Sequence, residues 1–580
     1  MNLKHASVLG LILAPVLAFS QAKQPAGNTP APATQVKALS QTDSLMVKQL
    51  FFSGLHEKTM ENFDQAADFF NRVLQTDANN SAAMYELAGL KKLQKKEAEA
   101  QQLLERAVAI SPNNEWFWIA LADSYEKTND LVKLELVFDQ LIRIDPDKAD
   151  YYFDKANAYY LQKRYEDALA VYAKLEAVTG LTDDLVAQRQ KIYLKLNKAD
   201  QAAAELEKLI AGNPGQIKYY LLLAEIYNSN KQQDKALKTL LDAEKLDANN
   251  GTVHLALADI YRDKKDNDAC FNELKLAFAI PELAVEQKVR IILGYIPKFP
   301  DANAKASALE LSRILITAHP QNAKAFAVYG DMLMQNGQYK EARPIYKKSI
   351  ELDANIYTVH EQLVRLDLGD NDANAALKDG QNALSLYPNQ AWMNYLVGVA
   401  YLQQKNFAKA ISYIKNATSL ELQDKDLLSQ SFSTLGDCYH ELKDDAKSDD
   451  AYDKALTYNP ENVYTLNNYA YYLSVRGQQL DKAAQMSKRS NQLQPNTPSF
   501  EDTYAWILFK QKNYTEARVW MEKALAHDKE HSAVQQEHYG DIMFYLGDVN
   551  GAVANWKKAK EYGGQSPVLD RKINEKRYIE

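Results

Sequence analysis

Small residues recur along this chain at a nearly constant interval, and that interval limits the possible folds more than any other feature. The first seven members of the series are 34 residues apart, and later steps are 34, 35 or 38 residues. Twelve of the fifteen positions hold alanine. A fixed period of this length predicts an array of copies of one small structural unit. The series is Ala66, Ala100, Leu134, Ala168, Ala202, Ala236, Cys270, Ala308, Ala342, Ala376, Ala410, Ser448, Ala483, Ala517 and Ala552.

The residues around each of these positions predict a pair of antiparallel helices. In WIALADSY (118–125) the apolar residues have the i, i+3, i+4, i+7 spacing of one helical stripe, and a second stripe follows a polar turn. Proline then ends many second helices because it cannot continue the backbone hydrogen bonds. Glycine or alanine on the first helix would let the two helices approach closely, where a bulky side chain would separate them. These first-helix positions are Gly54, Ala88, Gly330, Gly398, Gly436 and Gly540.

Together these patterns resemble the tetratricopeptide repeat family, whose 34-residue unit has the form W-x2-L-G-x2-Y, A-x3-F and P. The segments YGDMLMQNGQYKEARPIY (329–346) and LGDCYHEL (435–442) match well. About fifteen repeats fit between residues 47 and 566. The resemblance implies an all-α, right-handed superhelical solenoid of about fifteen antiparallel helix pairs. The family is a general-purpose scaffold, so the fold alone does not specify a function.

Departures from the period predict the domain organisation. Residues 44–282 form repeats 1–7 and residues 323–566 form repeats 9–15. Between them, 283–322 is an irregular repeat in which Pro297 and Pro300 end a helix early, so we expect a bend or hinge there. Residues 567–580 begin with a helix-start signal and predict a capping helix over the last repeat.

The first twenty residues predict a secretory signal peptide. A short basic start precedes the apolar run ASVLGLILAPVLAF, and Ala18-Phe19-Ser20 has the small-x-small pattern of a cleavage site. The run is too short to span a bilayer comfortably, and no later segment is long and apolar enough. Residues 21–43 are rich in Pro, Ala, Thr and Gln and predict a flexible linker. We therefore expect export to the periplasm or outer envelope of a bacterium.

Charge and cysteine content exclude some partners and some bonds. The formal net charge is −8 and is spread along the chain, which disfavours nucleic acid or an anionic membrane as the main partner. The chain has two cysteines, Cys270 and Cys438, which are far apart in sequence and belong to different predicted helix pairs. A disulfide between them is not expected.

Motifs with chemical potential are few. His527-Asp528-Lys529-Glu530-His531 matches H-x-x-E-H, but it falls in the link between two helices and has no third ligand. Cys270 holds a small-residue position, where we expect a buried thiol in place of alanine. His254 and His360 hold the position of Trp118 in its repeat, so we expect them to be in the core or half-buried. We therefore predict no catalytic residues, no metal, no cofactor and no enzymatic activity.

A partner would bind the concave surface, which first helices line in a solenoid of this kind. Large apolar side chains are unusual there unless a partner covers them, and aromatic anchors flanked by amides would suit an extended or helical peptide. The alternative for each residue is packing against a neighbouring repeat. The candidates are Trp116, Phe153, Tyr160, Trp392, Tyr395, Asn467, Asn468, Tyr471, Trp506 and Phe509.

Two functional classes follow. The first is a non-catalytic scaffold of the bacterial cell envelope that binds segments of partner proteins, such as envelope or secretion machinery, in its groove. The second is a glycan-binding or polysaccharide-export-associated solenoid, in which the same aromatics would stack on sugars. We prefer the first.

Overall fold

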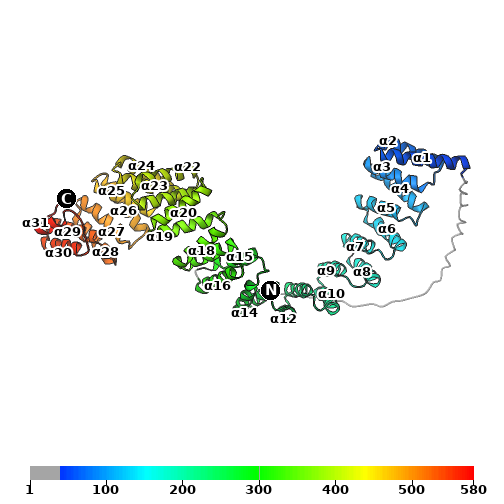
Figure 1. Cartoon of the computed structure of the whole chain (residues 1–580), viewed down its shortest axis with the longest axis horizontal. Coiled ribbons are helices and arrows are strands. Elements are labelled where there is room, and N and C mark those ends of the chain that lie inside the picture. The colour runs from blue at the N-terminus through cyan, green and yellow to red at the C-terminus, as the bar shows by residue number, and fades with distance from the viewer. Residues whose placement is uncertain (1–38, 300) are drawn as a thin grey trace, which may run out of the picture. The chain divides into compact units, whose positions relative to one another are not determined.

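The chain is described by a computed structural model that covers residues 39–299 and 301–580 (Figure 1). The predicted signal peptide and all but the last residues of the predicted linker lie outside the described residues. Every regular element in the described ranges is helical, and none of them is a strand. The all-α prediction is confirmed.

The chain divides into two compact units, which meet between Pro214 and Gly215. In the first unit the helices are α1 (Gln41–Thr59), α2 (Phe63–Thr76), α3 (Ser81–Leu93), α4 (Glu97–Ile110), α5 (Glu115–Lys127), α6 (Leu131–Ile144), α7 (Ala149–Leu161), α8 (Tyr165–Thr179), α9 (Asp183–Lys195) and α10 (Ala199–Gly212).

The second unit begins with α11 and ends with α31. Its helices are α11 (Ile217–Ser229), α12 (Gln233–Leu246), α13 (Gly251–Asp263), α14 (Asn267–Ala279), α15 (Val285–Leu293), η1 (Ile296–Lys298), α16 (Ala302–Ala318), α17 (Ala323–Gln335), α18 (Tyr339–Leu352), α19 (Tyr357–Gly369), α20 (Ala373–Leu386), α21 (Ala391–Gln403), α22 (Phe407–Leu420), α23 (Lys425–Glu441), α24 (Asp445–Tyr458), α25 (Val463–Val475), α26 (Leu480–Leu493), α27 (Pro498–Lys510), α28 (Tyr514–His527), α29 (Ala533–Tyr545), α30 (Val549–Glu561) and α31 (Leu569–Glu575).

Each odd-numbered helix up to α29 packs against the even-numbered helix that follows it, so these helices form fifteen pairs. We call the odd-numbered member the first helix and the even-numbered member the second helix. The pairs follow one another within each unit, and α31 packs on α30 as a cap (Figure 1). The prediction of a solenoid of about fifteen helix pairs with a C-terminal capping helix is confirmed.

A residue in the left-handed conformation follows most first helices and sets the repeat turn. In the first seven repeats it recurs every 34 residues, and after it the next amide donates to the carbonyl five residues back, as Asn62 does to Glu57 and Lys96 does to Lys91. This bond pattern satisfies carbonyls that the end of a helix leaves without partners. The seven left-handed residues are Glu61, Lys95, Asn129, Lys163, Asn197, Lys231 and Lys265.

The small-residue series lies in the core. All twelve of its alanines are fully buried, including Ala66, Ala342 and Ala517. Cys270 is the exception, because its thiol is only partly buried. Its helix α14 packs on α16 where other second helices pack on the next first helix, so the regular cover of this position is missing. The expectation of a buried thiol at Cys270 is therefore corrected.

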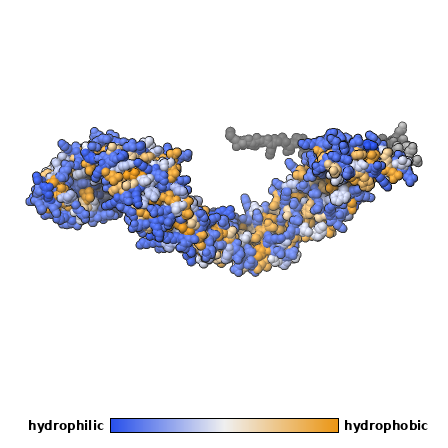
Figure 2. Space-filling model, turned by 45° about the horizontal axis from the view of Figure 1, so that its top comes forward, coloured by the Kyte–Doolittle hydropathy of each residue, from blue (hydrophilic) through white to orange (hydrophobic). Residues whose placement is uncertain are grey.

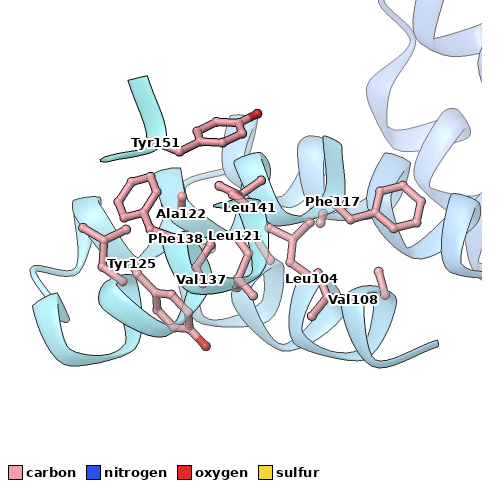
Figure 3. Packing of buried hydrophobic residues seen from close by; sticks show 14 of the residues in the cluster. Leu104, Val108, Phe117, Leu121, Ala122, Tyr125, Val137, Phe138, Leu141 and Tyr151 are labelled. Carbon is pink, nitrogen blue, oxygen red and sulfur yellow. The ribbon is translucent and has the colours of Figure 1, made fainter. Parts of the chain in front are cut away.

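The apolar core continues from one repeat into the next. In the first unit one cluster draws on α3 to α7, and Figure 3 shows Leu121, Val137 and Leu141 filling the space between these helices. The cluster also contains Leu104 and Tyr151, which lie in other repeats. Burial in this cluster is thus shared between neighbouring repeats.

Glycine on the first helix permits the close approach that the sequence predicts. A Cβ added to Gly54 would lie 2.8 Å from Phe70, and one added to Gly436 would lie 2.8 Å from Tyr452. Both distances are far below ordinary contact, so only glycine fits. Gly330, Gly398 and Gly540 are equally enclosed, each by the residue sixteen positions later in the chain.

The irregular repeat at 283–322 consists of the short α15, the single turn η1 and the long α16. Pro297 lies in η1, while residue 300 is outside the described residues. Val285, Ile292 and Leu311 belong to one core cluster with residues of α13, α14 and α17. The segment is therefore packed into the second unit, and its role as a hinge stays a prediction.

Candidate partner-binding surface

In the second unit, the first helices from α19 to α29 contact one another from repeat to repeat and form a continuous surface. Contacts join α19 to α21, α21 to α23, α23 to α25, α25 to α27 and α27 to α29. We call the side of this row that faces away from the second helices the first-helix face. The space-filling view shows hydrophobic side chains in small patches separated by hydrophilic surface (Figure 2).

Trp392 is the centre of a mixed aromatic and charged cluster on α21. The guanidinium of Arg365, from α19, lies 4.6 Å from the centre of the indole ring. The indole Nε1 donates a 3.1 Å hydrogen bond to Asp424, and the edge of Tyr395 meets the ring at 5.8 Å. Both aromatic side chains are half-buried. The ring is thus held in one orientation while part of it remains open to solvent.

Asp437 is the centre of a polar cluster between α23 and α25. It accepts hydrogen bonds from the hydroxyl of Tyr452 and from Asn468 Nδ2, the latter at 3.4 Å. Loss of hydration raises the pKa of Asp437 to about 6, although the two hydrogen bonds oppose that rise. His440 stacks on Tyr472 beside this cluster, with ring centres 3.6 Å apart.

The amides and tyrosines of α25 divide between the surface and the core. Asn468 and Tyr471 are half-buried on the first-helix face, but Asn467 is buried and its Oδ1 has no hydrogen-bond partner. Tyr469 is fully buried and stacks on Tyr452 with ring centres 5.0 Å apart. Asn467 is therefore enclosed by the protein and does not face the groove, contrary to the expectation for this position.

Trp506 and Phe509 are also buried, with 9% and 5% of their surfaces exposed. Their rings stack on each other at 4.9 Å, and His538 from α29 stacks on Trp506 at 4.0 Å. Tyr545 and Tyr578 cover Phe509 at 5.3 and 5.8 Å. The expectation of open groove residues is wrong for this pair, because side chains from α29 and from the C-terminal segment cover them.

The candidates of the first unit differ in exposure. Trp116 is 66% exposed at the start of α5. Phe153 is half-buried against Tyr172, with ring centres 5.7 Å apart. Tyr160 is half-buried against Tyr165, and the ammonium of Lys191 lies 4.5 Å from its ring centre. These three side chains lie on separate helices or opposite ends of α7, and no surface cluster like that of Trp392 joins them.

The histidine motif at 527–531 does not form a metal centre. His527 is the last residue of α28, and its Nδ1 lies 2.8 Å from Glu501. His531 follows in the link with φ of +60°, and its ring lies beside Tyr562. The two imidazoles therefore have different neighbours and do not face a common point.

One other group in the described residues has metal-ligand chemistry. Ligand atoms of Glu244, His254 and Glu273 lie within 4.8 Å of one another. His254 is buried, its Nδ1 lies 2.7 Å from Glu273, and its Nε2 lies 2.9 Å from the carbonyl of Ala248. Both ring nitrogens thus lie within hydrogen-bonding distance of oxygen atoms of the protein.

The contact of His254 with a carbonyl recurs at the same place in other repeats. In each case the side chain forms a hydrogen bond with the backbone carbonyl six residues earlier, in the turn between two repeats, and so stabilises that turn. His360 makes the same bond and is buried like His254, so the expectation that both histidines are in the core or half-buried is confirmed. The five pairs are Trp118 with Pro112, Tyr152 with Pro146, His254 with Ala248, His360 with Ala354, and Asn394 with Pro388.

Arg365, Asp437, His538 and Tyr578 are parts of this surface that the sequence patterns did not indicate. A sequence pattern that could have indicated Asp437 does exist. Asp437 follows a glycine, and an aromatic residue comes fifteen residues after it. Gly330-Asp331 and Gly540-Asp541 have the same form. Arg365 and Tyr578 act through neighbours in space, and no spacing in the sequence marks them.

Family models described as tetratricopeptide repeat match six segments of the chain. The matched segments are 119–180, 191–251, 323–356, 362–419, 429–462 and 505–526. They lie in both units and include α21, which carries Trp392.

Several curated proteins are similar in sequence. BBSome complex member bbs-4 of Caenorhabditis elegans is 24% identical over 347 residues, which are 58% of this chain and 72% of that protein. ER membrane protein complex subunit 2 of Xenopus tropicalis is 31% identical over 121 residues, which are 21% of this chain. The chain spans only 40% of the length of that second relative.

A solved tetratricopeptide repeat protein from Parabacteroides merdae is similar in structure. It is 16% identical, the match covers 44% of this chain and 99% of that one, and the TM-score is 0.35. Across the part of the chain that the structure describes, no helix is both long enough and apolar enough to cross a membrane.

Proposed function

Because the chain belongs to the tetratricopeptide repeat family, we propose that it is a non-catalytic scaffold that binds a segment of a partner protein on the first-helix face of its second unit. The observation that carries this proposal is the Trp392 cluster. A tryptophan fixed by a guanidinium and a carboxylate, but still partly open, has the composition of an interaction hot spot.

The cluster suits a peptide better than a small molecule. Trp392 and Tyr395 offer apolar anchors, while Arg365 presents a cation beside them. Asn468 and Tyr471 continue the surface on α25 with an amide and a phenol that can bond a peptide backbone. Side chains of this kind along neighbouring helices would bind an extended or helical segment.

We place the scaffold in the bacterial cell envelope, with envelope or secretion machinery as its partners. This part of the proposal depends on residues 1–20, whose basic start, apolar run and small-x-small pattern are typical of a secretory signal. N-terminal sequencing of the protein from its own cells tests it, because a mature chain that starts at Gln21 is expected. A chain that retains Met1 contradicts it.

Crosslinking in cells tests the binding site. A photoreactive residue in place of Trp392 should capture one protein partner, whereas the same residue in place of Lys454, an exposed residue of the second helix α24, should not. The captured partner should bind an Arg365→Ala or Tyr395→Ala chain at least about tenfold more weakly. Equal capture from both positions, or retention of the chain on a glycan array without any protein adduct, contradicts the proposal.

A further inference from the structure

The last residues of the chain turn back from the capping helix onto the first-helix face. α31 ends at Glu575, and Lys576 adopts a left-handed conformation with φ of +52°. The segment 577–580, which we call the tail, then runs to α29 and α27. Tyr578 reaches the rings of Tyr545 and Phe509, at 5.3 and 5.8 Å.

A charged pair fixes the end of the tail. Glu580 Oε1 lies 2.9 Å from Lys510 Nζ, and the same ammonium lies 5.0 Å from the ring centre of Trp506. The tail therefore places an aromatic side chain in an aromatic site and a carboxylate on a cation two residues later. Below the tail lies Phe509, which Tyr578 covers together with Tyr545 of α29.

The capping helix α31 is bound more strongly to the rest of the unit than the tail is. Leu569 and Lys572 of α31 are buried, and Lys572 donates to Asp541 at 2.8 Å and to Glu537 at 2.9 Å. In the tail, Tyr578 is only half-buried and the Glu580 side chain is 81% exposed. An ion pair at the surface contributes little, so the tail can leave its site while the cap remains in place.

We propose that the tail is an internal occupant of a peptide site made by α27 and α29, and that the partner of this site is a peptide with an aromatic residue followed two residues later by an acidic residue. Such a peptide would place its ring against Phe509 and Tyr545 and its carboxylate on Lys510. The tail competes with it and so lowers the affinity of the intact chain. This inference rests on the proposed function in that its site lies on the same face, on α27 and α29.

A labelled peptide of the sequence NEKRYIE (574–580) tests the proposal directly. A chain that ends at Lys576 should bind it, and the intact chain should bind it at least about tenfold more weakly, because the tethered tail has a high effective concentration at the site. An intact chain with Tyr578→Ala and Glu580→Gln should bind like the shortened one. Arg577→Ala is the matched control, since the guanidinium of Arg577 pairs with Glu575 of α31, and it should bind like the intact chain.

A charge exchange distinguishes a specific site from general attraction. In the shortened chain, Lys510→Glu should abolish binding of NEKRYIE and permit binding of NEKRYIK. A peptide with Ala in place of Tyr should bind neither chain. Hydrogen exchange of α27 and α29 shows whether each variant remains folded.

Two results overturn the proposal. One is a shortened chain that keeps the exchange protection of α27 and α29 but does not bind the peptide. The other is equal binding to the intact and shortened chains, which places the peptide elsewhere. If either result is found while the photoreactive residue at position 392 still captures a partner, only this inference is rejected. If that crosslink is lost while the shortened chain still binds the peptide, only the proposed Trp392 site is rejected.

Discussion

The hydroxyl of Tyr346 on α18 donates a 2.7 Å hydrogen bond to Asp331 on α17. The ring of Tyr346 also lies directly against Gly330. Two adjacent residues of α17 therefore contact one side chain of α18: Gly330 contacts its ring and Asp331 its hydroxyl. The device recurs twice among the described residues. Tyr452 meets Gly436 and Asp437, and Trp556 meets Gly540 and Asp541.

Gly330→Ala should destabilise its repeat. The new Cβ would lie 2.6 Å from Cδ1 of Tyr346, which is enclosed and cannot move away freely, so we expect a loss of about 1–3 kcal/mol. Hydrogen exchange of α17 and α18 measures this loss locally, which suits a repeat array. Gly89→Ala is the control, because Gly89 lies inside α3 with no atom near its Cβ position, and there alanine should stabilise by up to about 1 kcal/mol. Equal effects of the two substitutions would contradict the close-approach explanation.

Asp437 should make stability depend on pH. Burial raises its pKa from 3.8 to about 6 in the folded chain, so the folded state binds more protons than the unfolded state between these values. The contribution of this group is then complete below about pH 4 and is lost as the pH rises through about 6. The free energy of unfolding, measured with urea, should therefore decline between pH 4 and 7. Asp437→Asn should reduce this decline by roughly 1–2 kcal/mol.

Asp450→Asn is the control for the Asp437 experiment. Asp450 pairs with Lys454 on the surface of α24, so its replacement removes one negative charge without altering the buried cluster. The variant should keep the decline in stability between pH 4 and 7. An unchanged decline in the Asp437→Asn chain would show that Asp437 is not its source.

Lys572→Met should release the capping helix. Lys572 is 3% exposed and pairs with Asp541 and Glu537, so its replacement leaves two carboxylates without their cation. Removal of one partner from a buried ion pair costs about 3–5 kcal/mol, and we expect faster hydrogen exchange in α29 to α31. Lys560→Ala breaks the exposed pair with Asp570 and should cost less than about 1 kcal/mol. If both variants exchange alike, the buried pair does not anchor the cap.

The two thiols should differ in reactivity. Cys438 is fully buried and burial raises its pKa to about 12, while Cys270 is partly exposed and burial raises its pKa as well. Thiolate is the reactive form, so at pH 8 an alkylating reagent should modify Cys270 slowly and Cys438 only after unfolding. Mass spectrometry of the two cysteine peptides over time measures both rates. Faster labelling of Cys438 in the native chain would contradict the buried position.

Most of the fold could be predicted from the sequence because the same packing arrangement recurs in successive repeats. Ala66, Ala342 and Ala517 are all buried, and Leu466, Tyr469, Ala470 and Leu473 form the packing stripe that their spacing indicates. Cys270 departs from its series because its neighbour is the irregular repeat. Where the period is kept, a position in the sequence specifies a position in the core.

The candidate site was harder to predict, because exposure depends on what other repeats place above a residue. Asn467 and Asn468 are adjacent and chemically identical, yet one is buried and the other lies at the surface. Trp392 and Trp506 are aromatic residues of equivalent helices, but Arg365 leaves the first partly open while His538 covers the second.

The sequence by itself determined the repeating unit, the register of its helices and the residues between them, since these depend on contacts within one period. Only the tertiary structure decided which part of the first-helix face is open. The ring of Tyr578 lies on Phe509, 69 residues earlier in the chain, and no local pattern specifies a contact over that distance. Burial of apolar surface depends on all atoms nearby in space, so it is settled only when distant segments meet.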